Sequence, residues 1–324
     1  MLLLFSGCGK QFETEKTSDI YTPVDDNMIV VGVSQIGSES VWRTANSTSI
    51  QNVFTKENGY FLIFDNARQK QENQIKAIRS FISQQVDYIV FSPITEDGWD
   101  TVLQEAKDAG IPVILMDRKV NVKDESLYTT WVGSDFDAEG KNAGKWLSNY
   151  LEQKNLSSEN INIIVLQGTE GATAVIGRTN GFNTIAKKHD NWKILEQLNA
   201  EYTTAKGREV MEKMLKRYPD IDVVVSQNDD MTFGALEAIQ EKGLTTGIDG
   251  DIIIISFDAV RSALEKVEEG IINVDIECNP AQGEYIERVI RDLEEGKSVQ
   301  KYYYVPEKVF TKENVGDYID SRTY

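Results

Sequence analysis

Cysteine and histidine are almost absent from this chain of 324 residues. Its two cysteines, Cys8 and Cys278, cannot build a disulfide framework, and no cysteines or histidines have the spacing of a metal site. The one histidine, His189, lies between Lys188 and Asp190 and is expected in a solvated loop. These absences argue against a metal centre and against a histidine-based catalytic triad.

Basic residues are also scarce, with 34 Lys and Arg against 52 Asp and Glu and a net charge of −18. A nucleic-acid-binding protein needs a basic face, so that class is excluded, and charge alone would not hold the chain on an anionic membrane. No apolar run reaches the length of a transmembrane helix. A phosphate-binding GxxxxGK[ST] loop is missing too, so nothing supports nucleotide chemistry.

Short apolar runs do recur along the chain, and stretches with helical periodicity separate them. Repeated alternation of strand and helix predicts an α/β fold with parallel sheets and covering helices. The predicted strands are Ile29–Val33, Tyr60–Phe64, Tyr88–Phe91, Pro112–Met116, Ile161–Leu166, Val223–Val225, Ile252–Ile255 and Ile271–Ile276. The predicted helices are Gln71–Ser83, Trp99–Ala109, Gly140–Leu151, Gly207–Leu215 and Thr232–Lys242.

The strand–helix pattern runs twice, from about Met28 to Trp131 and again from about Ile161. With 40% hydrophobic residues and a length that suits two domains, the chain can bury a sizeable core. No low-complexity linker separates the two halves, which indicates two lobes joined by a hinge. A ligand would then lie in the crevice between opposing strand ends.

Polar and aromatic side chains follow several predicted strands. The segment Met28–Arg43 reads as a strand, a Gly/Ser loop and the start of a helix, which places Trp42 and Arg43 near the carboxyl end of a strand. Open α/β sheets bind ligands at that edge. An aromatic ring can pack on the C–H groups of a sugar while the guanidinium donates to its oxygens.

The pair Asp117-Arg118 ends another predicted strand and could grip adjacent hydroxyls as acceptor and donor, although an isolated pair could be a surface salt bridge. Asn228-Asp229-Asp230 lies between a strand and a helix, and we expect Asn228 to face a ligand while an aspartate caps the helix.

Further candidates are Arg178, Asp258 and Glu277, the last two at strand ends. Paired carboxylates could serve a glycosidase, but this set is rich in amides, arginine and aromatics. Such a mixture favours holding a neutral polyol over breaking it.

The amino terminus, Met1 to Gly7 followed by Cys8, resembles the end of a bacterial lipoprotein signal peptide, although its basic region is missing. In such lipoproteins the cysteine carries lipid. We therefore expect residues 1–27 to be a signal remnant and a polar tether, with Cys8 as the lipidation site. The alternative is an ordinary cytosolic terminus.

From Met28 onward the chain resembles the periplasmic sugar-binding proteins of ABC importers, in the ribose-binding-like cluster. The resemblance depends on the order and spacing of Asp117-Arg118, Arg178 before Gly181-Phe182, the run Gln227–Met231, and Phe257-Asp258. Within this cluster the chain is most similar to galactofuranose-binding proteins, through the stretches SQIGSESVWR, QKQENQIKAIRSF, AKDAGIPVILMDR and LQGTEGATAVIGR.

The resemblance implies a type I periplasmic-binding-protein fold of two Rossmann-like lobes with a three-crossing hinge. The N-terminal lobe would comprise residues 28–132 and 278–307, and the C-terminal lobe residues 133–277 and 308–324. It also implies a monomer without cofactor, outside the cytoplasm, either lipid-anchored or periplasmic, that delivers a monosaccharide to ABC permease subunits.

By the same resemblance, Trp42 and Tyr202 would stack on the sugar. The residues expected to hydrogen-bond it are Arg43, Asp117, Arg118, Arg178, Asn228 and Asp258, with Glu39 and Glu277 as further candidates. The chain departs from the ribose proteins at Ser40 and Val41, where those have two aromatics, and at Cys278, where they have a polar ligand. These departures favour a sugar other than ribose.

Two other functions stay open from the sequence. The same protein could present its closed form to a membrane kinase or chemoreceptor, as a sugar sensor, or it could be a sugar-processing enzyme. Lactose-repressor-type regulators share the fold but begin with a helix-turn-helix, which the acidic, lipoprotein-like terminus does not resemble.

Overall fold

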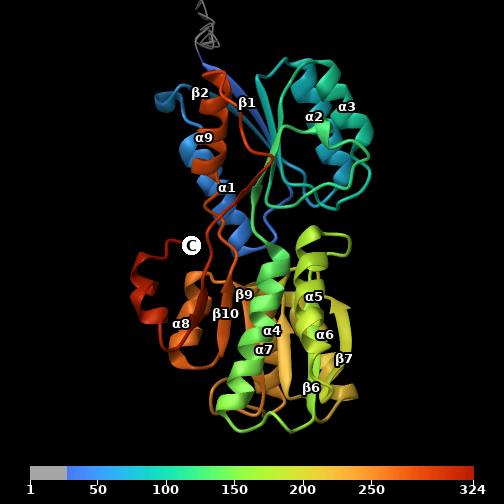
Figure 1. Cartoon of the computed structure of the whole chain (residues 1–324), viewed down its shortest axis with the longest axis vertical. Coiled ribbons are helices and arrows are strands. Elements are labelled where there is room, and N and C mark those ends of the chain that lie inside the picture. Colours follow the sequence, from blue (N-terminus) through green and yellow to red (C-terminus); the bar gives the residue numbers. More distant parts are fainter. Residues whose placement is uncertain (1–27) are drawn as a thin grey trace, which may run out of the picture.

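The computed structural model describes residues 28–324 and shows two α/β lobes stacked along the long axis of the molecule (Figure 1). Its strands are β1 Ile29–Gln35, β2 Tyr60–Asn66, β3 Tyr88–Phe91, β4 Val113–Met116, β5 Thr130–Gly133, β6 Ile161–Gln167, β7 Trp192–Asn199, β8 Val223–Ser226, β9 Ile253–Asp258, β10 Val274–Glu277, β11 Tyr302–Tyr304 and β12 Val309–Thr311. Its helices are α1 Val41–Val53, α2 Gln71–Ser83, α3 Asp100–Asp108, α4 Phe136–Gln153, α5 Thr173–Ala186, α6 Thr204–Arg217, α7 Asp229–Glu241, α8 Arg261–Glu269 and α9 Gly283–Glu294.

Each lobe has one six-stranded sheet. The order in the first is β11-β5-β4-β3-β1-β2, and in the second β12-β10-β9-β8-β6-β7. All neighbouring strands run parallel except β12, which is antiparallel to β10. In both sheets the strand order reverses at the first strand, between β2 and β3 in one lobe and between β7 and β8 in the other. Ligands of open α/β sheets bind at the carboxyl ends beside such a reversal.

Helices cover both faces of each sheet, which is why the central strands are continuous apolar runs. In the first lobe, α1 and α9 cover one face and α2 and α3 the other (Figure 1). Close approach matters at Gly32 of β1, where an added Cβ would lie 2.6 Å from the Phe81 ring of α2. In the second lobe, α4 and α5 pack on one face, and α6, α7 and α8 pack on the other.

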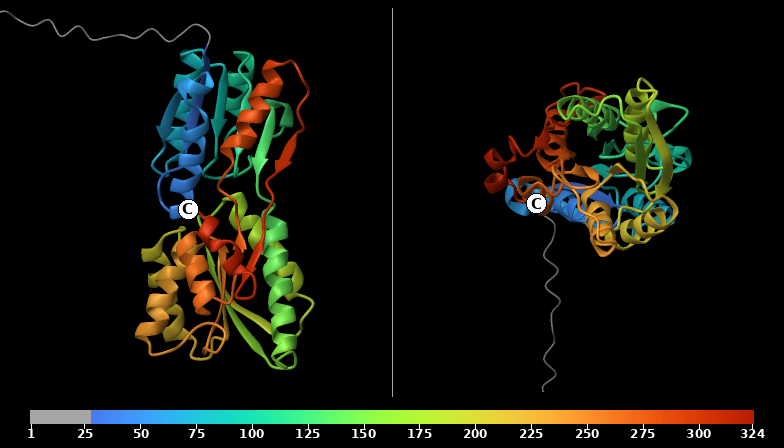
Figure 2. Two further views of the ribbon diagram at one scale, coloured as in Figure 1. Left: turned by 90° about the vertical axis from the view of Figure 1, so that its left-hand side faces the viewer. Right: turned by 90° about the horizontal axis from the view of Figure 1, so that it is seen from below.

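The chain crosses between the lobes three times, after β5, between β10 and α9, and between β11 and β12 (Figure 2). These crossings lie side by side and leave the carboxyl ends of the two sheets facing each other. The expected type I periplasmic-binding-protein architecture is confirmed by this arrangement.

Sequence patterns located most of the central elements. The predicted Tyr88–Phe91 and Gln71–Ser83 match β3 and α2 residue for residue. The edge strand β7 was missed because its polar and apolar residues mix, and β5, β11 and β12 were missed because they are only three or four residues long.

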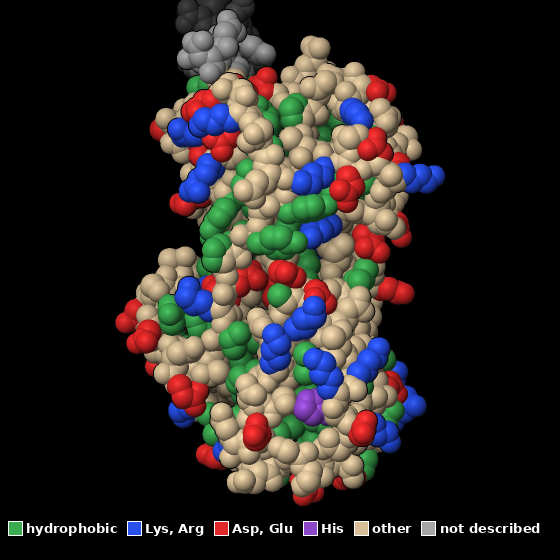
Figure 3. Space-filling view, viewed as in Figure 1, with side chains coloured by type: hydrophobic (Ala, Val, Ile, Leu, Met, Phe, Trp, Pro, Cys, Tyr) green, Lys and Arg blue, Asp and Glu red, His purple; other side chains and the backbone are tan. Residues whose placement is uncertain are grey.

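In residues 28–324, no helix is both long and apolar enough to span a bilayer. The proposed lipidation site Cys8 lies outside the described residues. Side chains of both charge signs are spread over both lobes on the face shown in Figure 3.

Candidate functional site

A cavity lies between the lobes, at the facing carboxyl ends of the two sheets. Its free volume is only about 30 Å³, so the lining side chains leave little empty space between them. Nine of the ten predicted ligand-binding residues line it, all except Glu277. The lining residues are Glu39, Ser40, Trp42, Arg43, Asp117, Arg118, Phe136, Ala174, Arg178, Tyr202, Asn228, Asp258 and Cys278.

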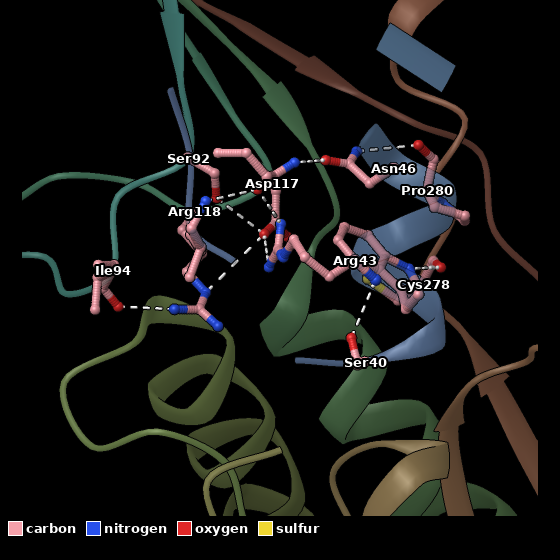
Figure 4. A network of polar contacts seen from close by, with 12 residues as sticks. Ser40, Arg43, Asn46, Ser92, Ile94, Asp117, Arg118, Cys278 and Pro280 are labelled. Carbon is pink, nitrogen blue, oxygen red and sulfur yellow. Dashed lines mark hydrogen bonds and ion pairs between the residues drawn. The ribbon is translucent and has the colours of Figure 1, made fainter. Parts of the chain in front are cut away.

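The wall from the first lobe is organised around Arg43 at the start of α1. The Ser40 hydroxyl caps this helix by accepting from the Arg43 amide at 3.0 Å. The Arg43 guanidinium donates to Asp117 Oδ2 at 2.7 Å and to Glu39 Oε1 at 3.2 Å (Figure 4). It also lies 4.6 Å from the centroid of the Trp42 ring. Burial alone would lower the pKa of Arg43, but the carboxylates of Asp117 and Glu39 outweigh it and raise this pKa.

Asp117 follows β4 in a left-handed backbone conformation, with φ 59°. Its Oδ2 accepts from Arg43 and also from the Ser92 hydroxyl at 3.1 Å, whereas Oδ1 accepts no hydrogen bond from residues 28–324. Arg118 is anchored by a hydrogen bond from Nη1 to the Ile94 carbonyl at 2.7 Å. Its guanidinium lies 5.5 Å from the centroid of the Tyr202 ring in the other lobe.

The wall from the second lobe is organised around Arg178 of α5. Nε donates to Glu139 of α4 at 2.6 Å, Nη2 to Asp258 at 3.3 Å, and Nη1 to the Gln227 carbonyl. Gly140 allows α4 to approach this closely, because a Cβ there would collide with the Arg178 backbone. Burial would lower the pKa of Arg178, but Glu139 and the other acidic groups around it raise this pKa well above its ordinary value.

Asn228 lines the cavity, but the expectation that an aspartate caps α7 is wrong. Its backbone is extended, one residue before α7, so its own Oδ1 caps the helix by accepting from the Met231 amide at 2.9 Å. Asp229 is the first helical residue and accepts from the Val260 amide at 2.8 Å. The asparagine is therefore the helix cap and the aspartate supports the loop after β9.

Left-handed backbone recurs among the lining residues. Besides Asp117, Tyr202 has φ 60° and Asp258 has φ 104°. Such conformations cost a non-glycine residue about 1–3 kcal/mol and persist only where the surroundings impose them. Contacts elsewhere in the fold must therefore stabilise the backbone at these three cavity residues.

Three acidic side chains, Glu39, Asp117 and Asp258, line the cavity together with three arginines, and burial raises the pKa of Asp258 well above its ordinary value. Each of these arginines is at most 4% exposed. Three buried polar atoms on the lining residues have no partner in residues 28–324: Glu39 Oε2, Arg118 Nε and Tyr202 Oη. Buried polar groups normally find partners. These atoms fit a small, uncharged ligand that carries several hydroxyl groups.

Both lobes close over this cavity. The Glu96 amide donates to the Gly171 carbonyl at 3.0 Å, and the Lys119 amide donates to Thr173 Oγ1 at 3.1 Å. The Val41 amide of α1 donates to Asp230 Oδ2 of α7 at 3.2 Å. The structure is therefore that of the closed form.

A sequence profile described as a periplasmic binding protein domain matches residues 31–298. The chain belongs to this family. Its members and the relatives below are binding proteins, not enzymes, and they act outside the cytoplasm.

The galactofuranose-binding protein YtfQ of Escherichia coli is 42% identical over 255 residues, 78% of each chain. A solved structure from Mycobacterium smegmatis, in complex with β-D-fucofuranose, has a TM-score of 0.87 and 40% identity and covers 91% of this chain and 95% of the other. The arabinose ABC transporter's periplasmic component from Shewanella sp. ANA-3, bound to α- and β-L-arabinofuranose, has a TM-score of 0.84 and 42% identity, with coverage of 91% and 95%.

The hinge of this binding protein is tied together by Glu307 in the third crossing. Its Oε1 accepts from the Asn279 amide of the second crossing at 3.0 Å and from the Ser134 hydroxyl of the first. Burial and the neighbouring Glu139 raise the pKa of Glu307 to about 9. At neutral pH it is therefore protonated in the closed form.

Glu139, Cys278 and Glu307 bring three potential metal ligands within 4.8 Å of one another. However, the Arg178 cation pairs with Glu139, and burial raises the pKa of the Cys278 thiol well above its ordinary value. A protonated thiol and a carboxylate already paired with arginine do not suit a metal cation.

Glu277 lies outside the cavity lining of the binding protein. Its Oε1 accepts from Arg322 at 2.7 Å and its Oε2 from the Lys308 amide at 2.9 Å. The contacts join β10 to the C-terminal segment.

Phe136 is a lining residue that sequence reasoning missed. It is the first residue of α4, and its ring centroid lies 5.5 Å from the Arg178 guanidinium. Its place just after β5, at another strand end, was the signal that could have identified it.

Proposed function

We propose that this binding protein captures one monosaccharide, in its furanose form, and delivers it to an ABC importer. The observation that carries the proposal is the closed cavity in which Glu39 Oε2, Arg118 Nε and Tyr202 Oη lack hydrogen-bond partners in residues 28–324. A sugar hydroxyl can donate to the carboxylate and accept from the guanidinium at the same time. The aromatic rings of Trp42 and Tyr202 would pack against its C–H groups.

The furanose form is supported by the two similar structures, which contain β-D-fucofuranose and L-arabinofuranose. Ser40 and Val41 stand where ribose-binding relatives have two aromatics, which supports a sugar other than ribose. The sensor alternative is not favoured, because relatives are components of importers.

Binding would work through closure of the hinge. A ligand can shift the open–closed equilibrium only by the difference in its affinity for the two forms. The first lobe supplies Arg43 and Asp117, and the second supplies Arg178 and Asp258, so a sugar touches both walls only when the lobes have closed. The closed form would then be the one that permease subunits recognise.

Lipid on Cys8, with residues 9–27 as a polar tether, would hold the protein at the outer face of the membrane. This part of the proposal depends on the sequence alone. Metabolic labelling with a palmitate analogue, compared between the wild type and Cys8→Ala, tests it directly; equal labelling of the two would exclude the anchor.

The sugar is tested by thermal unfolding with D-galactose, L-arabinose, D-ribose and D-fructose. A ligand at about 100 times its dissociation constant stabilises the folded state by about 2.7 kcal/mol, so shifts rank the sugars directly. We expect galactose or arabinose to give the largest shift, and NMR of the bound sugar to show a five-membered ring. No shift with any of these four sugars, or a bound six-membered ring, would contradict the proposal.

A further inference from the structure

The loop after β9 holds Asp258 in an unfavourable backbone conformation. Asp258 has φ 104° and the next residue, Ala259, has φ 59°. Neither is glycine, so this turn needs external support to keep its shape. The support matters because Asp258 lines the cavity and pairs with Arg178 at 3.3 Å.

Two buried carboxyl groups supply that support. The Ala259 amide donates to Asp275 Oδ1 of β10 at 3.1 Å, and the Val260 amide donates to Asp229 Oδ2 of α7 at 2.8 Å. The Ser256 hydroxyl donates to Asp229 Oδ1 at 2.5 Å. Both aspartates are fully buried, and neither lines the cavity.

Asp275 Oδ2 is buried and has no hydrogen-bond partner in residues 28–324. Burial and the nearby Asp275 raise the pKa of Asp229 well above its ordinary value, and burial raises that of Asp275 to about 7. The pair therefore keeps a proton at neutral pH.

We propose that Asp229 and Asp275 are positioning residues for sugar binding, which hold the turn 257–260 by accepting from its Ala259 and Val260 amides and thereby aim the Asp258 side chain into the cavity. This inference rests on the proposed sugar-binding function. It predicts that affinity depends on two side chains that never touch the sugar.

Charged groups around the pair come from several elements. Asp258 of β9 and Arg322 of the C-terminal segment act on Asp275, while Asp229, Asp230, Glu139 and Arg178 act on Asp258. Raising the pH removes the proton that the raised pKa values keep on the pair and leaves two buried carboxylates beneath the turn. Because the folded-state pKa is raised, the support is present at low and neutral pH and is lost as pH rises.

Asp275→Asn and Asp275→Ala separate positioning from folding. The asparagine can still accept from the Ala259 amide through its Oδ1, and it removes the second ionisable carboxyl group. The alanine leaves the Ala259 amide without its acceptor. We expect Asp275→Ala to weaken binding of L-arabinose and D-galactose by roughly 10- to 100-fold, and Asp275→Asn to stay within about threefold of the wild type.

Asn273→Ala is the matched control, because Oδ1 of Asn273, the residue before β10, accepts from the Ile254 amide of β9 at 2.8 Å. This substitution removes the same kind of contact between the same two strands, at the end remote from the cavity. It should lower the melting temperature and leave sugar affinity unchanged.

The pH profile gives the second readout, by isothermal titration between about pH 7 and about pH 10. Wild-type affinity should fall with rising pH by at least about fivefold more than that of Asp275→Asn, in which position 275 cannot ionise. Glu307 is present in both the wild type and Asp275→Asn, so a difference between their pH profiles comes from Asp229 and Asp275 and not from Glu307. If Asp275→Ala does not fold, these two profiles decide alone.

Identical profiles, or an Asp275→Ala protein with wild-type affinity, would overturn the inference while leaving sugar binding intact. A wild type that binds none of the sugars tested would instead overturn the proposed function.

Discussion

Asp117→Asn gives a direct test of the cavity as a sugar site. The substitution keeps the size of the side chain and removes its charge. Arg43 is not left without a partner, because Glu39 remains 3.2 Å from its Nε. The change should therefore act mainly on Oδ1, the atom that accepts no hydrogen bond from residues 28–324 and faces the ligand in our proposal.

The size of the effect follows from the burial of the pair. Asp117 and Arg43 are 3% and 4% exposed, so water does not replace a lost contact. A hydrogen bond from a sugar hydroxyl to a charged acceptor contributes about 1.5–3 kcal/mol. At about 1.4 kcal/mol for each factor of ten, affinity should fall by roughly 10- to 150-fold.

Isothermal titration with L-arabinose and D-galactose measures this fall. Asp108→Asn, an exposed aspartate at the end of α3, is the control and should bind both sugars as the wild type does. Thermal unfolding without sugar should show that Asp117→Asn still folds cooperatively. An Asp117→Asn protein that binds within about threefold of the wild type would refute the site, because no buried charged acceptor could then be involved.

Three further substitutions test the hinge, the cavity and the C-terminal segment. The wild type should lose stability as pH rises from 4.5, the pKa of Glu307 in the unfolded chain, through about 9, its pKa in the folded protein. Glu307→Gln should not show this loss. Equal pH dependence of the melting temperature in both proteins would contradict the protonated hinge. Tyr202→Phe should leave unfolding unchanged without sugar and weaken sugar binding by about tenfold in titration, because the buried hydroxyl has no protein partner. Glu277→Gln should lower stability by about 1–3 kcal/mol in urea unfolding by weakening the Arg322 pair, and a change in sugar affinity would show that Glu277 reaches the ligand.

Much of the cavity could be predicted from the sequence because parallel strands end at one edge. Trp42, Asp117 and Asn228 each follow an apolar run. Their positions after strands were enough to predict that they lie at the same edges of the sheets, although no distance was known. The same reasoning placed Glu277 with them, since it also ends a strand. Its strand β10 lies beside β12 towards the sheet edge, where the C-terminal segment supplies Arg322.

The supporting contacts could not be predicted in this way. Asp229 and Asp275 reach the turn after β9 from two other elements, and their meeting depends on the register of β9 with β10 and on the start of α7. Nor did the sequence indicate that Asn228 rather than an aspartate caps α7. One residue of shift at the helix start decides which side chain reaches the Met231 amide.

The indole of Trp42 donates to the Cys278 carbonyl at 2.5 Å, which attaches this wall of the cavity to one of the crossings. Residues near a hinge move least when two lobes separate. Opening would therefore displace Trp42 little, while it would separate Glu96 from Gly171, which lie far from the crossings. The sugar would thus bind first against the Trp42 ring, which is already in place, and only the opposite lobe would have to move. Selection among sugars would then begin in the open form, at the wall that carries Trp42.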